Sequence, residues 1–300
     1  QVPEIICQNE DHLVWSLDSV KQVYRPTYYL TNPHAQTVFN ALFRQPTQTD
    51  LRELMHLERT KHTFTNSGAT VYLDWITPKK NIHASPPEKT LFFMPGVVSG
   101  TDGVGILNLV QLALERNYRC IVFNYMSKDG LDVMTKEEYP IIPGVTHTIS
   151  DLSNILRIVE NELGEDHPLI GVGISLGANI LVQYVGERSS IVSSTAKREN
   201  PLFRMVDVDP KPKYFKGEVQ NRLSHVKRKN SQYLHPFKAI VAIGNPYDLD
   251  VSTDILAKNK LHHYLYDAAF VQKRADMFRT NITMTSTPET AAFDQQMLSI

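Results

Sequence analysis

The sequence predicts an α/β fold in which a mostly parallel β-sheet carries helices on both faces. From residue 90 onward, short apolar segments rich in Val, Ile and Phe alternate with longer segments of helical periodicity. A predicted β-hairpin precedes this alternation. The chain has 300 residues, of which 42% are hydrophobic, and this suffices for one large α/β domain with a substantial core.

The predicted elements follow one another in a regular order. The hairpin joins 61–66 to 70–76 through a Ser67-Gly68 turn. The segments after it are strands at 90–94, 119–125, 168–174 and 238–244, and helices at 104–117, 150–163 and 177–187. A Thr148-x-x-Asp151 capping box is expected to open the second of these helices. Strand and helix in alternation predict βαβ units and therefore a parallel sheet.

Composition divides the chain into regions. Residues 1–58 are predicted to be an N-terminal arm, and residues 59–300 the α/β domain. Within that domain, residues 188–236 are expected to be a basic polar insertion, because 186–238 holds twelve Lys and Arg against five Asp and Glu. Contact with an anionic membrane is an alternative role for the insertion. Residues 251–300 are expected to form lid helices.

Charge and cysteine content limit the function classes. A formal net charge of −1 gives no reason to expect nucleic acid as a partner. Cys7 and Cys120 are the only cysteines, and no metal-binding motif is present, so neither a metal nor another cofactor is predicted. The uncharged stretch 168–186 is interpreted as a buried strand and helix rather than a membrane span, because Ser175 and several glycines interrupt it.

Ser175 is the candidate nucleophile. Gly173-Ile-Ser-Leu-Gly177 is a G-x-S-x-G pentapeptide that follows a predicted strand and precedes a predicted helix. In this context the pentapeptide forms a nucleophile elbow, in which a strained turn lifts the serine hydroxyl clear of the sheet. The alternative is a buried serine in a glycine-rich turn.

An oxyanion hole is predicted from two backbone amides. One is that of Leu176, which follows the serine at a helix N-terminus, where the helix dipole favours negative charge. The other is that of Val97, in the loop Pro95-Gly-Val-Val-Ser-Gly100 after the strand at 90–94. A plain glycine-rich connection is the alternative for this loop.

Several segments, taken in order, resemble the α/β-hydrolase superfamily and, within it, the abhydrolase-domain family of usually membrane-anchored lipases and esterases. These segments are Asn32–Thr37, Pro95–Gly96, Asn117–Asn124, Gly171–Asn179 and Asn245–Leu249. The resemblance implies an α/β-hydrolase fold and a lipid or small ester substrate. In the family, the catalytic Asp follows a later strand and the catalytic His follows a glycine near the C-terminus. None of the eleven histidines here follows a glycine. We therefore expect the sheet to be incomplete at the C-terminus and the acid and base to lie beyond Ile300.

A substitute triad within the chain is the alternative. The order Ser…Asp…His permits Ser175 with Asp248 and either His262 or His263. Asp248 follows the strand at 238–244, but the two histidines fall on a predicted lid helix. The other interpretation is that Asp248 caps a loop and the histidines form a polar helix face.

The sequence thus predicts a serine hydrolase that cleaves carboxylic esters, with lipid or fatty-acyl esters implied by the resemblance. Three alternatives remain: a non-catalytic hydrolase-like binding protein, an inactive truncated form, and an acyltransferase that uses the same serine. Membrane association is expected, because the resembled family is usually membrane-anchored and the chain begins with Gln1 rather than Met. A cytoplasmic location is the alternative.

Overall fold

The computed structural model describes most of the predicted α/β core. The described residues are 22–23, 25–43, 51–63, 69–80, 82–83, 85–96, 99–124, 139–140, 145–195, 235–263 and 266. The chain forms two compact units, residues 1–48 and residues 49–300. In the first unit, helix α2 (Pro33–Phe43) begins after Asn32, whose side-chain Oδ1 accepts a 2.8 Å hydrogen bond from the His34 amide and thereby caps the helix.

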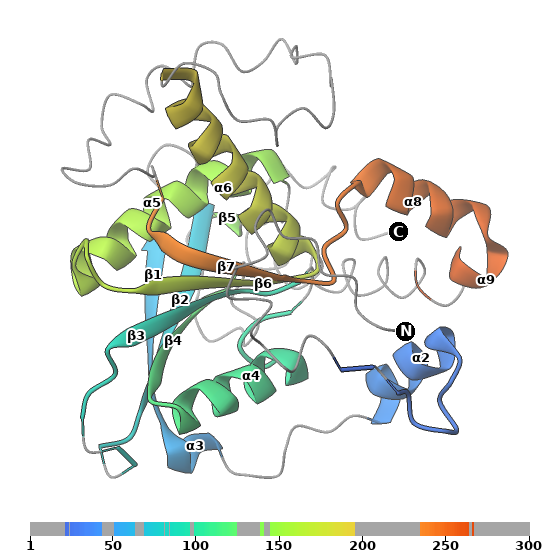
Figure 1. Cartoon of the computed structure of the whole chain (residues 1–300), viewed down its shortest axis with the longest axis horizontal. Coiled ribbons are helices and arrows are strands. Elements are labelled where there is room, and N and C mark those ends of the chain that lie inside the picture. The colour runs from blue at the N-terminus through green and yellow to red at the C-terminus, as the bar shows by residue number, and fades with distance from the viewer. Residues whose placement is uncertain are drawn as a thin grey trace, which may run out of the picture. The chain divides into compact units, whose positions relative to one another are not determined.

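Seven strands form one sheet in the second unit. Their order is β1-β2-β4-β3-β6-β7, and the short β5 pairs with β2 (Figure 1). β1 is antiparallel to β2, and β2 to β4, whereas β3 pairs in parallel with β4 and β6, and β6 with β7. The bounds are β1 (Met55–Thr63), β2 (Ala69–Pro78), β3 (Lys89–Met94), β4 (Tyr118–Asn124), β5 (Tyr139–Pro140), β6 (Leu169–Ile174) and β7 (Phe237–Ile243). The antiparallel pairing of the predicted hairpin and the mostly parallel sheet are confirmed, although β1 begins at Met55 rather than at residue 61. The predicted Ser67-Gly68 turn lies outside the described residues.

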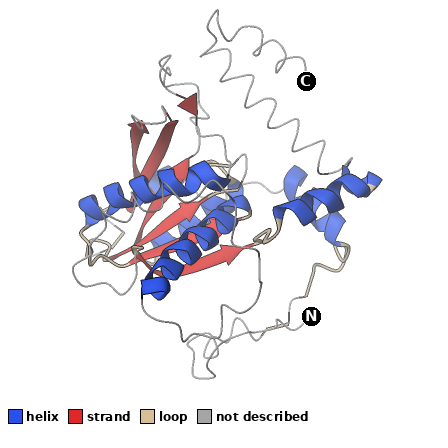
Figure 2. Cartoon of the chain, turned by 90° about the horizontal axis from the view of Figure 1, so that it is seen from above, coloured by secondary structure: helices blue, strands red, loops and turns tan. Residues whose placement is uncertain are grey.

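Helices cover both faces of this sheet, as predicted. Helix α4 (Val104–Glu115) lies on one face, and α5 (Val145–Leu163) and α6 (Leu176–Thr195) lie on the other (Figures 1 and 2). Successive strand residues point to opposite faces, so Phe92 packs in the cluster under α5 and α6 while Phe93 packs in the cluster under α4. The described residues contain no helix with the length and hydropathy that crossing a bilayer requires.

Cys120 lies in the core cluster under α4 and is fully buried. Burial raises the pKa of its thiol to about 12, because the thiolate would lose its hydration there. The thiol is therefore protonated at neutral pH and inert, as expected of a core cysteine. Cys7 lies outside the described residues.

Two helix boundaries differ from the sequence prediction by more than two residues. Helix α5 begins at Val145, so Thr148 lies inside the helix and the predicted capping box with Asp151 is wrong. Helix α6 was expected to end at residue 187 but continues to Thr195. Residues 188–195 contain no Gly or Pro, so no helix-terminating residue lies in this extension.

The C-terminal part of the described chain begins at the edge strand β7. After it come helices α8 (Leu249–Lys258) and α9 (Lys260–His262), within the segment predicted to be a lid. The side chains of Val241 and Ile243 on β7 are 49% and 41% exposed. Most of the predicted basic insertion, residues 196–234, lies outside the described residues, as do residues 267–300.

Candidate active site

Ser175 stands between β6 and α6 at the carboxyl edge of the parallel strands. Its φ of 54° lies in the left-handed region, which costs a non-glycine residue about 1–3 kcal/mol. Hydrogen bonds on both sides hold this conformation. The Ser175 amide donates to the Ile243 carbonyl on β7 at 2.9 Å, and the Ser175 carbonyl accepts from the Ala178 amide at 3.0 Å. The side chain itself is exposed, as the elbow geometry requires.

The two glycines of the pentapeptide permit close backbone approaches. A Cβ atom added to Gly177 would overlap the Met94 carbonyl oxygen and come within 2.5 Å of the Pro95 carbonyl oxygen, both at the end of β3. A Cβ atom on Gly173 would come within 2.7 Å of the Ala178 amide nitrogen. Only a residue without a side chain fits either position, so the first turn of α6 can pack directly on the sheet.

The loop that leaves β3 reaches Ser175. A Cβ atom added to Gly96 would lie 3.2 Å from the Ser175 Cβ and 3.7 Å from its Oγ. The loop in which the sequence predicts one oxyanion donor therefore starts beside the candidate nucleophile. Val97, the predicted donor itself, lies outside the described residues.

Leu176 is the first residue of α6. The amides of a helix's first turn have no acceptor within the helix, and the helix dipole adds positive potential there. Leu176 is 6% exposed and packs in the core cluster under α5 and α6. Its amide therefore belongs to a fixed part of the backbone next to the Ser175 side chain.

The substitute acid and base candidates lie on the α8–α9 segment. The Asp248 carboxylate accepts a 2.9 Å hydrogen bond from the Val251 amide and forms the N-cap of α8. The His262 amide donates a 3.3 Å hydrogen bond to the Asn259 side-chain Oδ1. The His263 amide donates a 2.8 Å hydrogen bond to the Asn259 carbonyl. Among the described residues, no hydrogen bond joins the Ser175 hydroxyl to any of these three side chains.

A polar cluster next to the site was not anticipated from the sequence. Asp74, Thr101 and Asn124 are buried at 0%, 8% and 5% exposure and are joined by hydrogen bonds. Asp74 interrupts an otherwise apolar stretch of β2, which is a sequence signal for a buried polar group but does not identify its partners.

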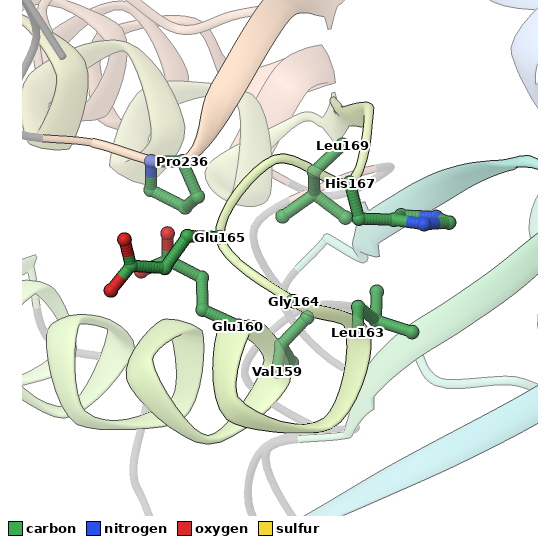
Figure 3. Close-up of a pocket in the computed structure, with 8 residues that line it drawn as sticks. All are labelled: Val159, Glu160, Leu163, Gly164, Glu165, His167, Leu169 and Pro236. Carbon is green, nitrogen blue, oxygen red and sulfur yellow. The ribbon is translucent and has the colours of Figure 1, made fainter. Parts of the chain in front are cut away.

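A small pocket lies at the opposite edge of the sheet, where β6 and β7 begin (Figure 3). Its volume of about 10 Å³ holds roughly one water molecule, so it is no substrate site. The His167 ring points away from Glu160 and Glu165 (Figure 3), and its Nε2 shares a 2.8 Å hydrogen bond with the Thr90 hydroxyl. In the described part of the chain, no group of three or more His, Cys, Asp or Glu residues is arranged to hold a metal ion.

Substituting Gly177 tests the close packing of α6 on β3. Gly177→Ala is expected to lower the free energy of unfolding by at least about 2 kcal/mol, because the added methyl group meets backbone atoms that are not free to rotate away. Gly186→Ala in the same helix is the matched control, since a Cβ there meets nothing within 4 Å. Urea unfolding of both variants provides the measurement. Equal stability of the two would contradict the packing described here.

Comparison with known proteins finds relatives that are similar in sequence to this chain. No family model matches the sequence. The chain is 28% identical over 193 residues to the embryogenesis-associated protein EMB8 of Picea glauca, covering 62% of this chain and 39% of that protein. It is 24% identical over 173 residues to the phospholipase ABHD3 of Mus musculus, covering 57% of this chain and 39% of that protein. The match thus spans 39% of the length of each relative.

Among solved structures, an esterase of Pyrococcus furiosus aligns with a TM-score of 0.38 and 15% sequence identity, over 77% of this chain and 70% of that one. The sheet order and the serine between β6 and α6 are those of the α/β-hydrolase fold. The chain thus has the α/β-hydrolase fold, and its sequence is similar to EMB8 and to the phospholipase ABHD3.

Proposed function

We propose that this chain belongs to a serine hydrolase that cleaves carboxylic esters, with Ser175 as the nucleophile. The conformation of Ser175 is the observation that supports the proposal most directly. Its left-handed φ is unfavourable, yet a hydrogen bond to the Ile243 carbonyl on β7 and one from the Ala178 amide on α6 maintain it. The side chain is nevertheless exposed. Backbone strain held at an exposed nucleophilic side chain is typical of functional sites.

In the proposed reaction, the Ser175 Oγ attacks the carbonyl carbon of the ester while its proton passes to a general base. The carbonyl π electrons move to the oxygen, which the amides of Leu176 and Val97 would stabilise. The C–O bond to the alcohol then breaks, and the alcohol leaves with the proton from the base. Water repeats the sequence on the acyl-enzyme and releases the carboxylic acid. A histidine oriented by an acidic residue would serve as the base.

A lipid or fatty-acyl ester is the proposed substrate. Support comes from the relative that is named a phospholipase and from apolar side chains on α8. Val251 and Ile255 occupy neighbouring turns of this helix and are 53% and 54% exposed. Helix α8 begins just after the carboxyl end of β7, whose last residue bonds to Ser175. A substrate of this kind is presented at a lipid surface, so association with that surface forms part of the proposal.

Ser175→Ala tests the nucleophile. The substitution is expected to reduce hydrolysis of a p-nitrophenyl ester by several orders of magnitude, in line with the effect of removing a catalytic serine. Labelling by a fluorophosphonate probe should be lost as well. Ser85→Ala, at an exposed position before β3, is the control. A Ser175→Ala variant that retained more than about a tenth of the rate would refute the assignment.

Asp248→Asn separates a capping role from a catalytic one. Asn caps helices about as well as Asp, so the fold and α8 should be preserved. We expect turnover to stay within about twofold, because the Asp248 carboxylate already accepts the Val251 amide as an N-cap. A loss of about 10⁴-fold at an unchanged melting temperature would instead identify Asp248 as the acid of a triad.

The double substitution Val251→Ser and Ile255→Ser tests whether α8 contacts the acyl chain. Turnover of a long-chain ester should fall about tenfold relative to a butyrate ester, because contact with two apolar side chains is lost. Leu112→Ser on α4 is the control, since Leu112 is similarly exposed at 47%. An equal effect on both chain lengths would exclude this contact.

A further inference from the structure

The loop between β3 and α4 is held at both of its ends. At the first end, Gly96 packs against Ser175. At the second, Gly103 forms the N-cap position of α4, and its amide donates a 3.0 Å hydrogen bond to the Gly100 carbonyl. Between the two ends, the Ser99 amide donates to the Gly96 carbonyl at 3.2 Å. Two backbone hydrogen bonds and the Ser99–Gly100 peptide thus link the second end to Gly96.

A buried carboxylate lies beneath the second end. Asp74 on β2 is fully buried and accepts two hydrogen bonds from the Arg59 guanidinium on β1, at 2.6 and 2.9 Å. A charge inside an apolar sheet is strongly destabilising without such partners. The carboxylate is consequently fixed in position by the β1–β2 hairpin.

Asp74 and Asn124 together bind the loop. The Thr101 hydroxyl donates to Asp74 Oδ2 at 2.5 Å, and Asn124 Nδ2 donates to the same oxygen at 3.1 Å. Asn124 Oδ1 in turn accepts the Thr101 amide at 2.8 Å. A Cβ atom on Gly100 would come within 2.5 Å of that Oδ1, so the approach of the loop to Asn124 requires glycine.

We infer that Asp74, Asn124 and Thr101, hereafter the Asp74 cluster, are positioning residues that hold the described part of the β3–α4 loop, and with it the Gly96 backbone beside Ser175, in place for oxyanion binding. The inference rests on the proposed function. None of the three side chains needs to touch the substrate. Their effect passes through the loop to Gly96 and thus to the backbone beside Ser175. Amides contribute most to an oxyanion when they are held in place before the reaction.

This role predicts a specific kinetic effect. Loosening the loop weakens an interaction that forms in the transition state, so kcat falls while KM changes little. A group that only supports folding lowers the melting temperature and leaves the kcat of the folded protein unchanged. The two roles are therefore distinguishable in one set of variants.

Thr101→Val removes the hydroxyl and preserves the side-chain shape. We expect kcat on a p-nitrophenyl ester to fall roughly tenfold or more, with KM within about twofold. The inhibition constant of a trifluoromethyl ketone, which mimics the oxyanion, should rise by about the same factor as kcat/KM falls. Thr101→Ser restores the hydroxyl and should recover most of kcat.

Thr90→Val is the matched control. Thr90 on β3 is fully buried, and its hydroxyl shares a 2.8 Å hydrogen bond with the His167 ring. This bond lies at the edge of the sheet opposite Ser175. The substitution should leave kcat and the inhibition constant unchanged. Asn124→Leu removes the acceptor of the Thr101 amide and is expected to have a larger kinetic effect than Thr101→Val if it folds.

Amide hydrogen exchange of the peptide spanning Pro95–Gly103 measures the protection of the loop backbone independently of catalysis. Exchange should be faster in Thr101→Val than in Thr90→Val. Unchanged exchange, or faster exchange with unchanged kcat, would overturn the positioning role while leaving Ser175 as the nucleophile. A lack of Ser175-dependent turnover in a form of the protein that continues past Ile300 would refute the proposed function and, with it, the catalytic consequence of the cluster.

Discussion

The close approach of α6 to the end of β3 is the constraint on which the candidate site depends. Gly177 lets the first turn of the helix rest against backbone carbonyls of Met94 and Pro95. This contact brings the helix N-terminus, the strand end and the β3–α4 loop to one point. Ser175 lies at that point in a conformation that a longer connection would relax. The meeting of the helix N-terminus, the strand end and the β3–α4 loop therefore depends on the missing side chain of Gly177.

A buried polar network on the α4 face of the sheet is the second constraint on the site. Arg59, Asp74, Asn124 and Thr101 join β1, β2, β4 and the β3–α4 loop in one hydrogen-bonded chain. Such a network has few alternative arrangements, because each buried polar atom that loses its partner is strongly destabilising. The antiparallel hairpin, far from Ser175 in the strand order, is thereby connected to the surroundings of the serine.

The sequence was sufficient for the parallel strands, the layers and the place of Ser175 between a strand and a helix, because apolar periodicity and glycine spacing are local signals. It missed the start of β1 at Met55 and the short β5. It was insufficient where the cause is not local. The start of α5 before Thr148 did not follow from a capping pattern, and α6 continued past residue 187 because no residue there stops it. The partners of Asp74 lie on separate elements, so an isolated carboxylate in a strand did not identify them. Asp248 occurred in an order that suits a triad, but the structure places its carboxylate at the N-cap of α8.

The hydrogen bond from Ser175 to Ile243 has a consequence for how the protein is made. The acceptor belongs to β7, which is synthesised well after the serine, with the whole of residues 196–234 between them. The turn at Ser175 therefore gains its cross-strand hydrogen bond only after β7 has been synthesised and has paired with β6. Because a domain generally folds as a unit, the elbow is complete only when a strand that is distant in the sequence has taken its place.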